Sequence, residues 1–190
     1  PQAPLAAAEA VVEQNGLSSA HATFIAPEEV ADYEARGWLI RHGIQYHWLN
    51  RGYASFDDFL GALSSRKRKA VRKERAAARE GLEFLALRGD EIGPEHWDAM
   101  WAFYQDTGSR KWGRPYLTRA FFGQVAASMG PSILLFLAQR DGRPIAGALN
   151  WVGADTLYGR YWGCMEEVPF LHFELCYHQA IEWACEHGLV

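Results

Sequence analysis

The chain of 190 residues is 49% hydrophobic and 22% charged, the balance of an ordinary globular protein able to bury a sizeable core. Its formal net charge of −4 excludes a protein that coats nucleic acid through a generally basic surface, so we expect no DNA partner. Three cysteines without CxxC spacing argue against a disulfide framework or a structural zinc site. We expect a cytoplasmic protein without a membrane span, because no apolar run is long enough and the N-terminus lacks a secretory signal.

The first 50 residues predict the order helix, strand, helix, strand. Apolar residues at helical spacing cover 5–14, and the alternation of AHATFI at 20–25 predicts a strand. Pro27 and two glutamates then open a helix that ends at Gly37, because proline and acidic residues both suit a helix N-terminus. The following residues, 38–53, are expected to be extended. This order is typical of the back half of an α/β unit.

The remainder predicts a mixed α/β fold with a mostly antiparallel sheet flanked by helices. Apolar residues at spacings of three and four predict one long helix over 56–81. A turn at Asp141-Gly142 between apolar runs predicts a hairpin within a three-stranded antiparallel meander over 132–165. A strand is expected at 82–89, and further helices at 95–108, 116–130 and 170–187.

The last strand of this meander carries a candidate binding site. Strict alternation along the strand would place four side chains on one face: Tyr158, Arg160, Trp162 and Cys164. An arginine between aromatic rings favours a bidentate contact to a carboxylate or phosphate. A structural cation–π contact or ion pair is the alternative, and the sequence leaves both open.

His172 and Glu174 lie in the first turns of the last helix, directly after that strand. Strand ends and helix N-termini often converge on a site, and either side chain could act as a general base, the carboxylate if burial raised its pKa. The alternative is a solvated helix face, because Glu174, His178 and Glu182 follow at intervals of four.

The loop at 109–116 offers cations and aromatic rings, among them Lys111, Trp112 and Arg114. Such a loop suits a lid over an anionic substrate, although interhelical loops are commonly polar in any case. The sequence contains no P-loop, HExxH or GxSxG motif and no His/Cys cluster at metal-ligand spacing. We therefore expect no metal.

The segment Ser64–Arg75 concentrates seven basic residues, while the rest of the chain holds 12 basic and 22 acidic residues. Arg68, Arg72, Arg75 and Arg79 share helical spacing and could follow the phosphates of a nucleic acid. The segment could instead border a cleft that receives an anion, or be a solvated helix face. The acidity of the remainder favours the cleft over the nucleic-acid surface.

Four long segments resemble the FemAB-like family of predicted N-acyltransferases, and the resemblance spans nearly the whole chain. They are FDDFLGALSSRKRKAVRKER, WDAMWAFYQDTGSRKWGRPYLTRAFF, DGRPIAGALN and GRYWGCMEEVPFLHFELCYHQAIEWA. The family is similar to Fem-type peptidoglycan aminoacyltransferases, which are built from two GNAT-like halves. The resemblance implies that 1–53 end a first half and that 54–190 form a second half, incomplete at its C-terminus, in a longer protein.

The resemblance also implies a reaction, the aminolysis of an activated acyl group by an amine on a small molecule or a cell-wall precursor. The donor would be acyl-CoA or aminoacyl-tRNA, with no tightly bound cofactor. GNAT enzymes hold the pyrophosphate of acyl-CoA in a glycine-rich turn, whereas GCMEEVPFLHFE stands at that place here, which disfavours CoA.

From these arguments we assign candidate roles. Glu174 or His172 would be the base, and Tyr177 or Tyr161 a proton donor. The expected substrate contacts are Arg160, Tyr158, Trp162, Lys111, Trp112, Arg114, Arg68 and Arg72. The alternatives are an anion- or RNA-binding module that acts through 64–75, and a GNAT-like scaffold without activity. The oligomeric state is left open.

Overall fold

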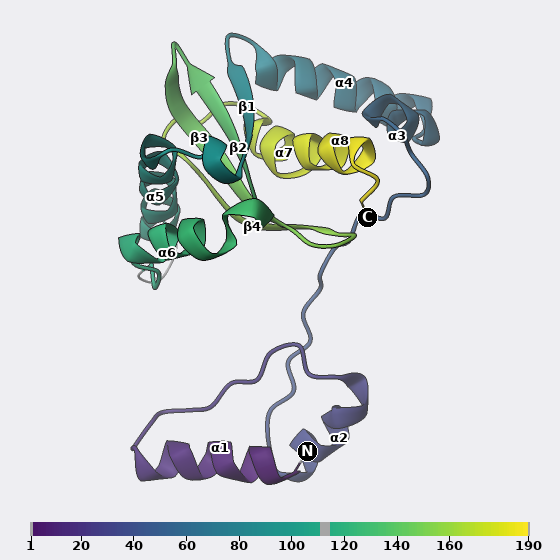
Figure 1. Ribbon diagram of the computed structural model, residues 1–190. Helices are drawn as coiled ribbons and strands as arrows, with labels where there is room; N and C mark the ends of the chain where they lie inside the picture. Colours follow the sequence, from purple (N-terminus) through teal and green to yellow (C-terminus); the bar gives the residue numbers. More distant parts are fainter. Residues whose placement is uncertain (1, 111–114, 190) are drawn as a thin grey trace. The chain divides into compact units, whose positions relative to one another are not determined.

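The computed structural model describes residues 2–110 and 115–189, and the chain divides into two compact units between His47 and Trp48 (Figure 1). Each unit is described by itself. The assignment of 1–53 and 54–190 to two GNAT-like halves stays a prediction.

The N-terminal unit contains the helix α1 (Gln2–Gln14), the short 3-10 turn η1 (Pro27–Glu29) and the helix α2 (Val30–Ala35). The helices begin and end close to where the sequence predicts. The Glu9 carboxylate on α1 accepts hydrogen bonds from the Arg36 side chain and, at 2.7 Å, from the indole N–H of Trp38. The hydrogen bond from Arg36 lowers the pKa of Glu9 to about 2.

The strands predicted in this unit are wrong. Residues 20–25 form no ladder with any described segment, and Phe24 has a φ of 58° and is 91% exposed. Residues 38–50 are irregular. Alternation alone does not make a strand, because an extended segment needs a neighbour to satisfy its backbone groups, and this unit provides none among its described residues.

The C-terminal unit is built on one antiparallel sheet in the order β1-β2-β3-β4. The strands are β1 (Glu83–Arg88), β2 (Ile133–Arg140), β3 (Arg143–Val152) and β4 (Leu157–Cys164). The predicted meander is confirmed, and β1 extends it by pairing with β2. The mixed α/β class is therefore correct.

Helices cover both faces of this sheet (Figure 1). The helices α5 (Pro94–Ser109) and α6 (Arg119–Met129) lie on one face, joined to β1 and β2 by the short turns η2 (Gly89–Glu91) and η3 (Gly130–Ser132). The last helix covers the other face, and consists of α7 (Leu171–Phe173), the π turn η4 (Glu174–His178) and α8 (Gln179–Glu186). The central strand β2 is buried on both faces, which explains its unbroken apolar sequence.

The single long helix predicted over 56–81 is wrong, because the chain breaks into α3 (Phe56–Ala62) and α4 (Ser65–Arg79). Leu63 is extended, and the Ser64 hydroxyl accepts a hydrogen bond from the Lys67 amide at the start of α4. The Arg68 guanidinium donates to the carbonyls at the end of α3, with the closest contact at 3.1 Å. A serine N-cap and an arginine C-cap thus satisfy both broken ends.

Strand β4 lies unusually close to α5 at Gly163. A Cβ atom built on Gly163 would lie 2.6 Å from the carbonyl carbon of Phe103, a distance that real side chains do not show. The neighbouring atoms belong to helical backbone and cannot rotate away. The lack of a side chain at Gly163 therefore sets how closely α5 packs on the strand that carries the candidate site.

We predict that Gly163→Ala lowers the free energy of unfolding by about 2 kcal/mol, because overpacking forces the helix and strand apart. Urea denaturation of the full chain measures the change. Gly123→Ala on α6 is the matched control: its Cβ would meet no atom within 4 Å, so alanine there should leave stability unchanged or raise it. Equal effects of the two substitutions would contradict the proposed close packing.

Candidate functional site

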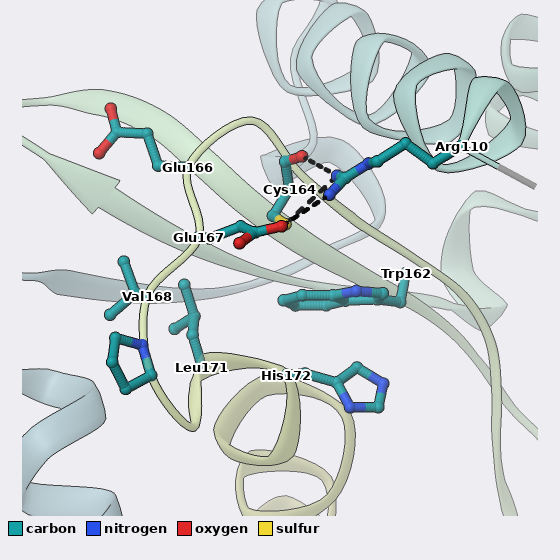
Figure 2. A pocket seen from close by; sticks show the side chains of 9 residues that line it. Arg110, Trp162, Cys164, Glu166, Glu167, Val168, Leu171 and His172 are labelled. Carbon is teal, nitrogen blue, oxygen red and sulfur yellow. Dashed lines mark hydrogen bonds and ion pairs between the residues drawn. The ribbon is translucent and has the colours of Figure 1, made fainter.

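A pocket of about 500 Å³ lies between the end of β4 and the start of α7, where the sequence predicts one (Figure 2). Val168, Pro169 and Leu171 supply its aliphatic wall, and Trp162 and His172 contribute aromatic rings. The loop from β4 enters α7 through Phe170, which has a φ of 65°. A positive φ is strained for a bulky residue, and such strain is often found at functional sites.

His172 is exposed and lies against the Trp162 ring, with the ring centroids 5.0 Å apart and the planes at 70°. Tyr177 lies on the other side of His172, with its ring centroid 5.9 Å away, and is 49% exposed. The structure thus brings together three residues predicted for the site. They form an aromatic cluster at the pocket with an imidazole at its centre.

Arg110, at the end of α5, reaches across the edge of β4 (Figure 2). Its guanidinium donates to the Cys164 carbonyl at 2.9 Å and to the Glu167 carboxylate at 3.2 Å, and it also pairs with Asp106. Hydrogen bonds to the side chains of Cys164 and Asp106 raise the pKa of Arg110. The Thr107 hydroxyl makes a similar contact to the Trp162 carbonyl at 3.2 Å. Side chains at the end of α5 therefore bind the carbonyls of Trp162 and Cys164 in β4.

The charges around the pocket are balanced. Glu166 accepts a hydrogen bond from Arg140 at 3.2 Å and pairs with Arg143, and it points away from Trp162 and His172 in Figure 2. Asp106 and Glu167 both pair with Arg110. These contacts bring the total to three carboxylates and three guanidinium groups. Among the described residues the pocket therefore has no excess of positive charge, and the anion-receiving cleft stays a prediction.

Strand β4 does not alternate strictly, because it contains a β-bulge. Gly159 pairs with Asn150 and Tyr161 pairs with Leu149, which leaves Arg160 without a partner residue on β3. The extra residue shifts every side chain before it to the other face of the sheet.

The predicted shared face of Tyr158, Arg160, Trp162 and Cys164 is consequently wrong. Tyr158 lies opposite Trp151, which packs with the α5 and α6 side of the core. Trp162 packs on the opposite side, against the last helix. Residues directly opposite in a ladder share a face, so Tyr158 and Trp162 lie on different faces.

Arg160 belongs to a second cluster, on the α5 side of β4. Its guanidinium lies 4.8 Å from the centroid of the Tyr161 ring and donates to the Tyr116 hydroxyl at 3.4 Å. The two tyrosine hydroxyls are 3.2 Å apart. Burial and the hydrogen bond with Tyr116 raise the pKa of Tyr161 to about 12, so its hydroxyl stays protonated at neutral pH. Arg160 and Tyr161 are thus neighbours, but they form a cluster separate from that of His172.

Glu174 is fully buried in an ion pair with Arg75 of α4. The guanidinium donates to both carboxylate oxygens, at 2.9 and 3.0 Å, and Gln179 and His178 contact the same carboxylate at 2.9 and 3.3 Å. Burial alone would raise the pKa of Glu174, but the hydrogen bonds from His178 and Arg75 outweigh it and lower the pKa to about 2.

This environment suits Glu174 to a structural role and not to that of a base. Its lone pairs are occupied, its proton affinity is low, and a substrate cannot reach it. The alternative of a solvated face fails as well, since Glu174 is inaccessible and Glu182 is drawn to Arg75 at 2.6 Å. The burial has a local cause: Glu174 opens the π turn, whose extra residue changes the phase of the helix.

The other predicted contacts divide into two groups. Arg68 caps α3, and Arg72 makes an exposed ion pair with Asp57 at 2.9 Å. With Arg75 buried, the proposed row of phosphate-binding arginines on α4 is wrong. Lys111, Trp112 and Arg114 lie outside the described residues, so the lid stays a prediction.

The sequence analysis counted Arg110 among the cations of the loop at 109–116, but it did not predict the pairing of Arg110 with Glu167 or the inward role of Arg75. Arg75 lies four residues after Val71 and three before Ala78, so its helical spacing already placed it on the apolar stripe. No local signal marks the pair of Arg110 and Glu167, which meet through tertiary packing. Within residues 2–110 and 115–189, no group of three or more His, Cys, Asp or Glu is arranged to hold a metal ion.

The family model described as FemAB-like, peptidoglycan biosynthesis/recognition, matches residues 2–190. The chain belongs to the FemAB-like family. The resemblance noted in the sequence is therefore confirmed, and it connects the protein in general terms with peptidoglycan.

No curated protein matches this FemAB-like chain. It is similar to a solved structure from Staphylococcus epidermidis ATCC 12228, described as a functionally unknown conserved protein, with 14% identity and a TM-score of 0.34. The alignment covers 66% of this chain and 52% of the other, so the match spans about half the length of that protein. None of the helices in the described part of the chain is long and apolar enough to cross a membrane.

We predict that Arg75→Met lowers the free energy of unfolding by about 3 kcal/mol, because it leaves the Glu174 carboxylate buried without its main partner. Arg72→Met is the control on the same helix, since its exposed pair with Asp57 should contribute less than about 1 kcal/mol. Urea denaturation measures both. A similar loss of unfolding free energy in the two variants would show that the buried ion pair contributes no more than the exposed one.

The low pKa of Glu174 predicts a specific acid sensitivity. A carboxyl with a pKa near 2 when folded and 4.5 when unfolded stabilises the fold above pH 4.5, and this stabilisation disappears as the pH falls toward 2. The difference in unfolding free energy between the wild type and Glu174→Gln should therefore shrink over this interval, by about 3 kcal/mol. Denaturant titrations at a series of pH values test this, and a constant difference would contradict it.

Proposed function

We propose that this protein transfers an activated acyl or aminoacyl group to an amine of a cell-wall precursor, with His172 as the proton acceptor. Two findings support the proposal: the family is described for peptidoglycan biosynthesis/recognition, and a pocket opens at the end of β4. The observation that carries it is the placement of His172. Its imidazole lies at this pocket, 5.0 Å from the Trp162 ring and beside Tyr177.

The chemistry requires a base, a place for the acyl carbonyl, and room for the substrate. An amine that attacks a carbonyl must lose a proton, and imidazole accepts it near neutral pH. When the tetrahedral intermediate collapses, the bond from the acyl carbon to the donor breaks and the departing group takes up a proton, for which Tyr177, beside His172, is our candidate donor. The aliphatic wall of Val168, Pro169 and Leu171 suits the alkyl part of an amine acceptor.

Strand β4 offers candidate donors for the oxyanion that forms during this attack. The carbonyls of Trp162 and Cys164 contact α5 side chains. In an antiparallel strand the N–H and C=O of one residue point to the same side, so the amides of these two residues also point away from β3. Backbone N–H groups at such a position stabilise a negatively charged oxygen.

We infer an aminoacyl ester, as carried by tRNA, as the donor in preference to acyl-CoA. The loop between β4 and α7 lacks the glycine-rich turn that holds the pyrophosphate of acyl-CoA in GNAT enzymes, and its Pro169 has no N–H to donate. A pyrophosphate would find little support there. The cluster of Arg160, Tyr161 and Tyr116 supplies donors for an anionic group of the substrate on the other side of the strand.

The test is an acyl-transfer assay with the full-length protein, using aminoacyl-tRNA or acetyl-CoA as donor and a nucleotide-linked muropeptide as acceptor. Product formation is followed by mass spectrometry. We expect transfer by the wild type and a fall in kcat of at least about 100-fold in His172→Ala, because a positioned base contributes that much.

His42→Ala is the control for this assay, since it removes an exposed histidine from the N-terminal unit. It should leave kcat unchanged. No product from any combination of donor and acceptor would overturn the transferase proposal. Normal turnover by His172→Ala would instead refute the role of this histidine alone.

A further inference from the structure

The basic helix α4 has two sides that differ in the type of cation they carry. Four of its arginines contact other parts of the protein, and among them Arg68 caps α3, Arg72 pairs with Asp57, and Arg75 pairs with Glu174. Arg79 lies 3.7 Å from Glu174 and 5.3 Å from the centroid of the Phe84 ring. These four follow spacings of four, three and four, which place them along one side of the helix.

The opposite side carries what we call the outer face of α4, formed by Arg66, Lys67, Lys69 and Lys73. All four are exposed, and within the described part of the chain they make no hydrogen bond or ion pair that would neutralise them. The segment from Ser65 to Lys73 contains no acidic residue. In Figure 1, α4 packs on the last helix at the periphery of the C-terminal unit, so the outer face is turned to solvent.

This arrangement is unfavourable for the isolated fold. Arg66 and Lys67 lie in the first turn of a 15-residue helix, where the macrodipole favours acidic residues and disfavours cations. The concentration of like charges adds repulsion between neighbours. The outer face therefore costs stability, which an anionic partner would restore.

The residue types indicate what kind of anion fits. Lysine is a compact, hydrated charge without the planar fork with which arginine recognises single phosphates, and three of the four outer cations are lysines. The small side chains of Ala70, Ala76 and Ala77 lie beside them, and no aromatic ring is present for a base to stack on. A smooth, lysine-rich helix suits a diffuse layer of negative charge more than a folded or single-stranded RNA.

We propose that the outer face of α4 binds the surface of an anionic lipid bilayer. Lysines and arginines close to a bilayer surface are attracted to acidic headgroups, and each raises the partition coefficient between bilayer and water about fivefold. The interaction is peripheral and electrostatic, so it weakens as salt screens it. It does not depend on the proposed transferase activity.

Co-sedimentation with vesicles tests this proposal, using the full chain and vesicles of phosphatidylcholine with or without phosphatidylglycerol. We expect binding to the vesicles that contain phosphatidylglycerol, none to neutral vesicles, and weaker binding as the salt concentration rises. Lys69→Gln combined with Lys73→Gln should lower the partition coefficient about 30-fold. Both positions are exposed and unpaired, so the variant should fold, which thermal denaturation verifies.

The matched control is Arg41→Gln combined with Arg51→Gln, which removes the same total charge from exposed positions outside α4. It should change the partition coefficient less than about twofold, because neither residue belongs to the outer face of α4. Absence of binding by the wild type at low salt overturns the proposal, as does an equal loss in the control. Binding of tRNA that the lysine substitutions abolish, without vesicle binding, would show a nucleic-acid surface instead.

Discussion

The buried ion pair between Arg75 and Glu174 joins two segments that lie 99 residues apart in the chain. It fastens α4 to the last helix at the π turn, and Gln179 and His178 complete the shell around the carboxylate. A charge is tolerated in such a place only when its partners are fixed, so the pair demands one relative position of the two helices. The residues just before the turn are held by the same constraint. His172 can therefore project outward because Glu174 is anchored inward.

The sequence predicted best those elements whose signals are local. The turn at Asp141-Gly142 and the period-two runs around it were sufficient for β2, β3 and β4. The break at Ser64 was missed because the apolar stripe continues across it, and only the capping contacts reveal it. The strands expected in the N-terminal unit were wrong although their signal is local. Their alternation is local, whereas a strand exists only if a neighbouring strand pairs with it.

The site was predicted in position but only partly in composition. A pocket between the last strand and the following helix was expected, and Trp162 and His172 were assigned to it. Arg160 was placed on the wrong face, because a bulge is invisible to a strict alternation. The contact of Arg110 with Glu167 depends on how the end of α5 meets a loop more than 50 residues later, which no periodicity encodes. The seven basic residues of Ser64–Arg75 were treated as one cluster, whereas in α4 some of them contact the protein and the others face solvent.

Two irregular features lie in the elements that carry the pocket, the bulge at Arg160 in β4 and the π turn in the last helix. Each adds one residue to an otherwise regular element and leaves the hydrogen bonding on either side intact. A single inserted codon is enough to create either feature in an ancestor with a uniform strand or helix. Side chains at this end of the fold can thus be re-aimed during evolution without rebuilding the apolar interior.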